Sequence, residues 1–353
     1  LADILVAQGR LREAAQTNQQ AIQLAAQHGP EAQHITAHHY LGLALLAREM
    51  GEDAAAAEHL QKAEEMGKQT TLVDWSYRWH IAQARLKESG GDLDAALVQL
   101  DKARRAYVKT PIPDTRPIDA LKANVYLKQG RLEKALEWAR ARGLSADDEI
   151  SYLGEFEHLT LARVLMTEYQ CRRDRRSLAQ AMQATGLLER LLKFAAAQKR
   201  TASVIEILVV QALAYQAQGN LPLALTSLER ALTLAKPEGY FRLFVDEGEP
   251  MRLLILDFRL KIENQPPDQD QALIAYTDRL VSAFTRSTAI PQSKINNQQS
   301  AILDLVEPLS ERELDVLRLL RTEMGGPEIA STLMVSINTF RTHTKNIFAK
   351  LGV

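Results

Sequence analysis

The chain has 353 residues, of which 46% are hydrophobic and 25% are charged, and its formal net charge is −1 at pH 7. This length predicts roughly two or three globular domains with buried cores. The near-neutral charge excludes a polyanion-binding character for the whole molecule, so any affinity for nucleic acid has to be local. A single cysteine excludes an internal disulfide framework, and no signal peptide or apolar run of membrane length occurs. We therefore expect a cytoplasmic protein with no membrane partner.

Residues 1–245 predict an array of helical repeats. A short motif begins at Gly9, Gly51, Gly91, Gly130 and Gly219. It consists of glycine, then leucine or aspartate two residues later, and then alanine. The glycines recur at intervals of roughly forty residues, with one diverged copy expected near 174–179. Each glycine can adopt the left-handed conformation that ends a helix, and the alanine leaves room for a partner helix. The pattern predicts an all-α fold of tetratricopeptide-like hairpins stacked into a superhelix with a concave surface.

Aromatic side chains are the candidates for an effector groove in this array. Trp75, Tyr77 and Trp79 cluster on one predicted helix, and aromatics in a groove can stack on a sugar or an apolar ligand. Trp75 and Trp79 are four residues apart, so packing between hairpins is the alternative that the spacing favours. Histidines also gather on one segment, at His34, His38 and His39. No carboxylate or cysteine is spaced to complete a metal site there, so we expect no metal.

The array ends in a more specific phrase. Residues 231–248 read ALTLAKPEGYFRLFVDEG. This run resembles the A-x-P-E-G-Y-x-R-x-F-V-D-E-G phrase that closes the repeat region of MalT-like, large ATP-binding LuxR-family regulators. The resemblance implies a signal-responsive transcription activator whose superhelix, residues 1–245, binds a small-molecule inducer or a regulatory protein.

That family places ATP binding in a domain upstream of the repeats. No G-x-x-x-x-G-K-[ST] phosphate loop occurs here, because Gly67-Lys68 lacks the earlier glycine and is followed by glutamine. We expect no cofactor in this chain.

Residues 246–308 predict a connection between two domains. Apolar runs predict one helix over 250–262 and another over 271–284. Residues 285–300 are then rich in Ser, Thr, Gln and Asn, which is typical of a flexible linker. The following domain is therefore expected to be tethered to the repeats.

Residues 309–353 predict three short helices. Ser310 and Glu313 have capping-box spacing ahead of an apolar face that includes Val316, and Pro327 opens a second helix that includes Ile329. Ser336 is a good N-cap for the third helix. One stripe of this helix is expected to pack inward, namely Ile337, Phe340, Thr344, Ile347 and Leu351.

The other side of the third helix carries cations, amides and hydroxyls, and no carboxylate occurs from Ser336 to Val353. The runs LSERE, EIA, VSINTFRTH and KLGV resemble the LuxR-type helix-turn-helix, whose third helix enters the major groove. The resemblance implies base-edge or groove contacts for Arg341, Thr342 and Lys345. It implies phosphate contacts for Thr339, His343 and Lys350. Ser336 and Asn338, in the first turn, complete the expected DNA-binding set.

The sequence departs from this family in two ways that matter. Phe340 replaces the usual valine, and Gly325-Gly326-Pro327 replaces a serine, asparagine and lysine, which removes one cation. The family's fourth helix, which pairs two copies, is missing after Val353. We therefore expect a fragment of a longer polypeptide, with a truncated helix-turn-helix domain.

Two functions are consistent with the sequence. The first is a DNA-binding transcription regulator, with promoter DNA as partner, a dimer or higher oligomer on DNA, and RNA polymerase as a candidate further partner. The alternative is a helical-repeat interaction scaffold that binds no DNA in this truncated form. An enzyme is not expected, because no nucleophile with a base partner, no carboxylate pair and no metal-ligand spacing occurs.

Overall fold

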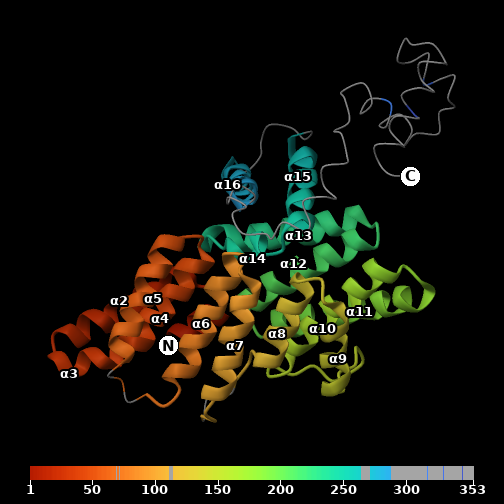
Figure 1. Cartoon of the computed structure of the whole chain (residues 1–353). Coiled ribbons are helices and arrows are strands. Elements are labelled where there is room, and N and C mark those ends of the chain that lie inside the picture. Colours follow the sequence, from red (N-terminus) through yellow and green to blue (C-terminus); the bar gives the residue numbers. More distant parts are fainter. Residues whose placement is uncertain are drawn as a thin grey trace. The chain divides into compact units, whose positions relative to one another are not determined.

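The computed structural model describes residues 1–68, 70, 72–110, 114–263 and 271–287, together with Val316, Ile329 and Thr344. They fall into two compact units, Leu1–Thr288 and Ala289–Val353, which we describe separately. All regular structure among these residues is helical, which confirms the predicted fold class (Figure 1). None of the described helices combines the length and the apolar composition needed to cross a membrane.

The first unit consists mainly of helical hairpins. The hairpins are α1 (Ala2–Ala7) with α2 (Leu11–Ala26), α4 (Ala37–Glu49) with α5 (Asp53–Gly67), α6 (Trp75–Ser89) with α7 (Leu93–Ala106), α8 (Ile118–Lys128) with α9 (Leu132–Arg142), α10 (Glu155–Arg172) with α11 (Arg175–Ala197), and α12 (Thr201–Ala217) with α13 (Leu221–Ala235). The short α3 (Pro30–Gln33) and the 3₁₀ turn η1 (His34–Thr36) join the first hairpin to the second. The predicted array of tetratricopeptide-like repeats is confirmed.

The turns of the hairpins follow the predicted glycine motif. The five glycines all have a positive φ, between 71° and 80°. In the diverged copy Arg173 takes the left-handed conformation instead, with a φ of 52°, and Asp174 caps α11 by accepting the Ser177 N–H. The alanine five residues after each glycine is buried. In the second copy this residue is Ala56, whereas Ala54, which the motif predicted, is exposed.

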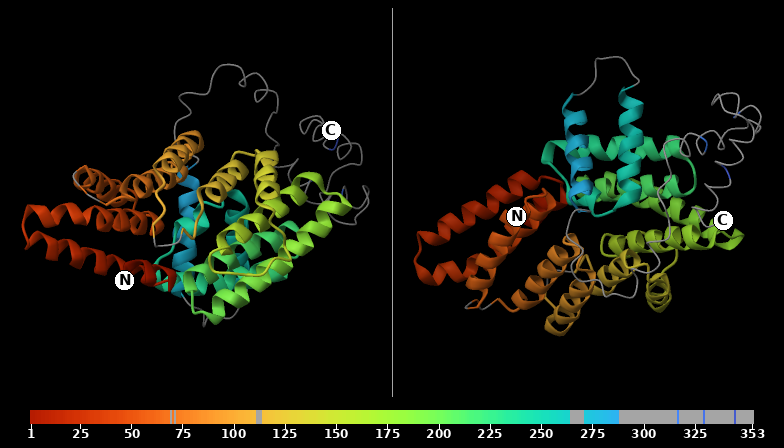
Figure 2. Two further views of the ribbon diagram at one scale, coloured as in Figure 1. Left: turned by 90° about the horizontal axis from the view of Figure 1, so that it is seen from below. Right: turned by 45° about the horizontal axis from the view of Figure 1, so that its top comes forward.

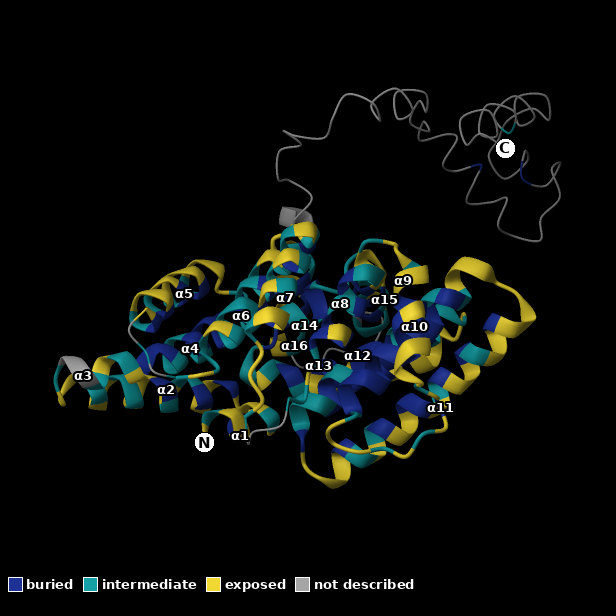
Figure 3. Ribbon diagram, turned by 60° about the horizontal axis from the view of Figure 1, so that its bottom comes forward, coloured by how far each residue is buried: buried dark blue, intermediate teal, exposed yellow. Residues whose placement is uncertain are grey.

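The two helices of a hairpin differ in their surroundings. The first helices, α4, α6, α8, α10 and α12, are in contact with one another or with α1, and we call them the inner helices. The second helices, α5, α7, α9, α11 and α13, are the outer helices. The inner α10 and α12 are buried on nearly every side, while the outer α11 alternates between buried and exposed faces (Figure 3).

Residues 236–248, which we call the closing segment, contain the 3₁₀ turn η2 (Lys236–Glu238) and α14 (Arg242–Val245). This segment contacts α4 from the start of the array and α12 from its end. It lies between the early and late hairpins (Figure 2). At one of these contacts Gly51 lies directly under the ring of Phe241, where a Cβ atom would overlap it. The closing segment therefore joins repeats that are far apart in the sequence.

Two further helices, α15 (Glu249–Glu263) and α16 (Gln271–Ser287), occur where the sequence predicted them. Helix α15 packs on α13, and α16 packs on α14 and α15. The first packed unit therefore continues past residue 245, to Thr288. The proposed flexible linker at 285–300 lies almost wholly outside the described residues.

Three residues of the second unit are described. Val316 and Ile329 are helical, as predicted for the first and second helices, and both are 1% exposed. Thr344, on the predicted inward stripe of the third helix, is helical and half-buried.

Candidate functional site

The first unit contains a partly open cavity of about 640 Å³. Its walls come from α1, α2, the inner helices and the closing segment. The apolar lining includes Leu45, Leu46, Leu121, Leu127, Phe156, Met166, Val210 and Leu213. The charged lining includes Asp3, Arg48, Glu49, Arg85, Glu88, Arg116, Lys128, Arg163, Glu206, Arg242, Asp246 and Glu247. The cavity is thus lined by apolar side chains and by charges of both signs.

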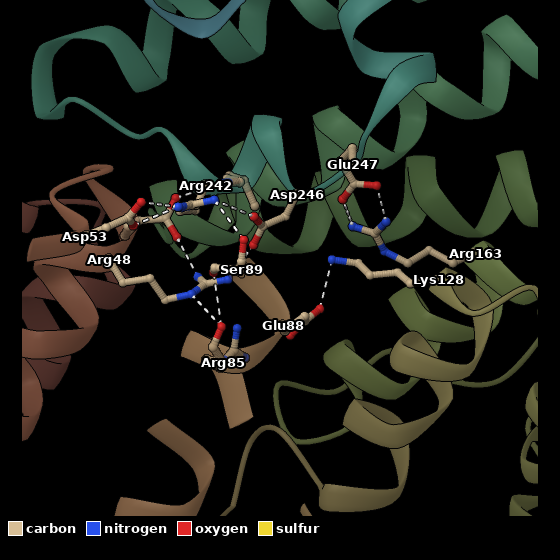
Figure 4. Close-up of polar contacts among 12 residues, drawn as sticks. Arg48, Asp53, Arg85, Glu88, Ser89, Lys128, Arg163, Arg242, Asp246 and Glu247 are labelled. Carbon is tan, nitrogen blue, oxygen red and sulfur yellow. Dashed lines mark hydrogen bonds and ion pairs between the residues drawn. The ribbon is translucent and has the colours of Figure 1, made fainter. Parts of the chain in front are cut away.

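One group of charges fixes the closing segment to α4, α5 and α6 (Figure 4). Arg48, only 5% exposed, forms an ion pair with Asp246, and its Nε donates to the backbone oxygen of Arg85 at 3.1 Å. Arg242 donates to Asp53 Oδ1 at 2.7 Å. Because partners so far apart in sequence are paired, these contacts hold the early repeats against the end of the array.

A second group of ion pairs involves the later inner helices. Arg163 makes a bidentate pair with Glu247, with N–O distances of 2.7 and 2.6 Å. Lys128 Nζ lies 2.8 Å from Glu88 Oε1. Arg116 and Glu206 are also bidentate, at 3.2 and 2.5 Å.

These pairs shift the acidity of their members. Burial alone would lower the pKa of Arg48, but Asp246 and Glu49 outweigh it, and the pKa is raised. Burial alone would raise the pKa of Glu206, but Arg116 outweighs it, and the pKa is lowered. In both cases the partner favours the charged form, so these groups are ionised within the cavity wall.

Two neighbouring groups behave in the opposite way. Burial, together with the nearby cations Arg116 and Arg48, lowers the pKa of Arg85 to about 10. Burial raises the pKa of Glu49 to about 7, although Arg48 and the backbone N–H of Leu243, which donates to Glu49 Oε1 at 3.0 Å, oppose that rise. The charged forms of Arg85 and Glu49 are therefore poorly compensated in this structure.

The aromatic candidates do not line the cavity, and they lie on two different sides of α6. Trp75 and Trp79 pack in a cluster with Leu41, Leu60 and other residues of α4 and α5, and the Trp75 ring lies against Gly67. The hydroxyl of Tyr77 donates to Asp114 Oδ2 at 2.7 Å. None of the three aromatics is among the described residues that line the cavity. Their contacts are those of residues packed between hairpins.

Two of the three histidines make separate contacts, while the Nδ1 of His34 has no hydrogen-bond partner among the described residues. His39 Nδ1 lies 3.0 Å from Asn18 Oδ1, and His38 Nε2 lies 3.4 Å from Asp74 Oδ1. All three are half-buried. Burial is the main cause that lowers the pKa of His38 and of His39, so both are neutral at pH 7.

The residues predicted to contact DNA lie outside the described residues. They are Ser336, Asn338, Thr339, Arg341, Thr342, His343, Lys345 and Lys350. Their roles stay predictions.

Sequence reasoning missed the cavity charges, although a signal for them exists. Three inner helices carry the dipeptide Ala-Arg in an otherwise apolar stretch, at Ala47-Arg48, Ala84-Arg85 and Ala162-Arg163. In each case the alanine is buried, at 4% exposed or less, and the arginine lines the cavity. The outer helix α7 carries Ala103-Arg104 with an equally buried alanine but an exposed arginine, so the dipeptide indicates an inward-facing charge only where it lies on the first helix of a hairpin.

Comparison with known proteins supplies the family. Residues 1–259 match the family model of the MalT-like TPR region, and residues 307–353 match that of the bacterial regulatory proteins of the luxR family. The HTH-type transcriptional regulator MalT of Klebsiella pneumoniae subsp. pneumoniae is 30% identical over 146 residues, which cover 39% of this chain and 16% of that protein. The HTH-type transcriptional regulator MalT of Cronobacter sakazakii is 32% identical over 131 residues, covering 36% of this chain and 14% of that protein. The matched segments thus span less than a fifth of these relatives.

Proposed function

The chain belongs to the family defined by the MalT-like TPR region, and from that membership we propose that it is a DNA-binding transcription regulator whose repeats control its DNA affinity. The observation that carries the proposal is the order of two family matches in one chain, the repeats at 1–259 and the luxR-family match at 307–353. The two relatives named above carry the description HTH-type transcriptional regulator. The proposal assigns no reaction to the chain and places it in the cytoplasm, with access to DNA.

The DNA-reading part of the proposal rests on the third helix of the luxR-family match. Arg341, Thr342 and Lys345 contact base edges in the major groove, and the flank formed by Thr339, His343 and Lys350 contacts phosphates. Ser336, the predicted N-cap, and Asn338, in the predicted first turn, complete the proposed DNA-binding set. The absence of any carboxylate from residue 336 onwards in the sequence supports a face that meets a polyanion.

The sensing part of the proposal rests on the cavity. Pockets of about 300–1,000 Å³ commonly hold small molecules, and this one measures about 640 Å³. Arg242, Asp246 and Glu247 of the closing segment line it, and the next helices, α15 and α16, pack on that segment or on α13. An effector in the cavity would contact the segment that leads toward the DNA-reading domain. In the active state the protein binds promoter DNA as a dimer or higher oligomer and recruits RNA polymerase as an activator.

The proposal is tested by fluorescence-anisotropy titration of labelled duplexes, one from the region upstream of the gene and one of random sequence. Binding should weaken steeply with salt, because each phosphate contact releases counterions. Arg341→Ala should cost about 1–3 kcal/mol on the upstream duplex and less on the random one. Lys345→Ala should weaken binding to the upstream duplex as well.

Arg230→Ala is the matched control, because Arg230 is an exposed arginine on the outer helix α13. It should leave both titrations unchanged. If the folded chain has no measurable affinity for either duplex, the regulator proposal fails for these residues and the interaction scaffold replaces it.

A further inference from the structure

We propose that the cavity binds a small molecule with one anionic group, a carboxylate or a phosphate, on an apolar body, and that Arg85 is the partner of that anion. The inference rests on the sensing role proposed above and names the chemical class of the effector. Four observations support it. An arginine in the cavity has no direct ion-pair partner in the described part of the chain, and the carboxylates near it are bound to other groups. A buried hydroxyl lacks a hydrogen-bond partner among the same residues, and the rest of the lining is largely apolar.

Arg85 is the first of these observations. It lies on the inner helix α6 and lines the cavity. Its backbone oxygen accepts the hydrogen bond from Arg48 Nε (Figure 4). Within the part of the chain that the structure describes, its guanidinium has no ion pair or hydrogen bond, although Glu88 and Glu206 lie near enough to favour its charged form. Arg48 and Arg116 lie close enough to repel it, and together with burial they bring its pKa down to about 10. An anion beside this guanidinium would offset both the repulsion and the lost hydration.

The carboxylates nearest to Arg85 are already engaged elsewhere. Glu88 pairs with Lys128 at 2.8 Å, and Glu206 is held by both nitrogens of Arg116. Glu49 accepts the N–H of Leu243 at 3.0 Å. Glu88 and Glu206 favour the charged form of Arg85 from a distance. Among the described residues, however, no carboxylate pairs directly with its guanidinium, which leaves that position to the anion of a ligand.

A buried hydroxyl lies in the same wall. Tyr240 lines the cavity and is 4% exposed, yet its hydroxyl has no hydrogen-bond partner among the described residues. Burial and the nearby Glu49 raise its pKa, so the hydroxyl keeps its proton and can donate. A buried donor without a partner is rare in folded proteins, and an oxygen of the ligand would satisfy it.

The rest of the ligand has to be largely apolar. Leu121, Leu127, Phe156 and Leu213, from three different inner helices, line the same cavity. A guanidinium can form two parallel hydrogen bonds to a carboxylate or a phosphate, which would fix the head group while the body lies along these side chains.

Isothermal titration calorimetry on the whole chain tests the proposal without DNA. The probes are octanoate and octyl phosphate, with neutral octanamide for comparison. We expect one molecule of at least one anion to bind per chain, more tightly than octanamide. Arg85→Gln should weaken that binding at least about tenfold, which corresponds to the loss of one charge-assisted contact. The anion that binds more tightly identifies the head group as carboxylate or phosphate.

Arg105→Gln is the matched control, because Arg105 is exposed on α7, the outer helix of the same hairpin. It should bind the probes as the unaltered chain does. Arg85→Lys, which keeps the charge but loses the two-pronged contact, should give an intermediate Kd.

Two results overturn the proposal: neither anion binds the folded chain at millimolar concentration, or Arg85→Gln binds an anion as tightly as the unaltered chain. Circular dichroism establishes that each variant is folded. A chain that binds the anions but no DNA overturns the regulator proposal and leaves the cavity assignment standing.

Discussion

The inner and outer helices of the same hairpins use charge differently. On the outer helix α5, Lys62 and Glu58 form an exposed pair four residues apart, at 2.7 Å. On the inner helix α4, Arg48 is buried and reaches Asp246, almost two hundred residues away in the sequence. Exposed pairs contribute little to stability, whereas a buried charge that loses its partner is costly. In these two pairs the exposed charges stabilise only their own helix, whereas the buried charge connects distant repeats; Asp53, at the start of the outer helix α5, shows that an outer charge can also make such a connection when it faces the closing segment.

The largest expected effect comes from removing the partner of Arg48. Asp246→Ala leaves that buried guanidinium with only the longer, 3.8 Å pair to Glu49, and we expect the free energy of unfolding to fall by about 3–5 kcal/mol. Glu58→Ala, on the exposed pair of α5, should leave the unfolding midpoint unchanged. Urea denaturation followed by circular dichroism measures both. Equal effects of the two substitutions would remove the distinction between inner and outer charges.

The second comparison concerns two glycines with the same backbone conformation. Gly51 and Gly91 have φ values of 76° and 78°, but a Cβ on Gly51 would overlap the Phe241 ring, while a Cβ on Gly91 would meet no atom within 4 Å. Alanine in the left-handed conformation costs about 1–2 kcal/mol at either position. At Gly51 the overlap should add about 1–3 kcal/mol. Identical losses of stability for Gly51→Ala and Gly91→Ala would show that the contact of Phe241 with the turn at Gly51 does not restrict the side chain at that position.

The third prediction concerns pH. The pKa of Glu49 rises from 4.5 to about 7 on folding, so the folded state holds this proton more tightly than the unfolded state. The stability that Glu49 contributes is therefore present at low pH and is lost as pH rises between these values. Glu49→Gln removes this dependence, and the amide oxygen that it introduces can still accept the Leu243 N–H. At pH 8 the variant should be more stable than the unaltered chain by roughly 3 kcal/mol, with a smaller difference at pH 5.

The charges that face Glu49 are Arg48, Asp246 and Arg85, and Tyr240 also lies near it. The two arginines stay charged and the tyrosine stays neutral between pH 5 and 8, so the difference between the two proteins reports on Glu49. Parallel stability profiles from pH 5 to pH 8 would contradict this assignment.

The smallest expected effect is a gain. Burial and the cations Arg116 and Arg48 disfavour the charged form of Arg85 by more than Glu88 and Glu206 favour it. Arg85→Gln should therefore raise the free energy of unfolding by about 1–2 kcal/mol in the absence of ligand. Urea denaturation checks it, with Arg105→Gln as the neutral control. A lower free energy of unfolding for Arg85→Gln would show that Arg85 stabilises the ligand-free fold, which contradicts its assignment as a ligand-binding residue.

The repeats were predictable from the sequence because they depend on local rules. Gly9, Gly91 and Gly130 mark helix ends through a conformation that glycine favours, and the following alanine marks a close helix contact. The diverged copy was located by its interval, although Arg173 replaces the glycine there.

The cavity was not predictable in the same way, because its contacts are not local. Arg163 meets Glu247, and Arg48 meets Asp246, only after the array has curved round to bring the closing segment against α4 and α10. No local sequence pattern specifies which arginine of the inner helices pairs with which carboxylate of the closing segment. The phrase around Arg242 and Asp246 was noted as a family resemblance, but its role in joining repeats required the structure.

Coupling between an anion-binding cavity and a DNA-reading helix within one chain is the central claim. The most direct test is an anisotropy titration of the upstream duplex, with and without a saturating amount of the anionic probe that calorimetry selects. For the unaltered chain we predict tighter DNA binding with the probe, and by thermodynamic reciprocity DNA should tighten probe binding by the same factor. Arg85→Gln should bind DNA alike in both conditions. Identical DNA affinity with and without bound probe in the unaltered chain would contradict the coupling.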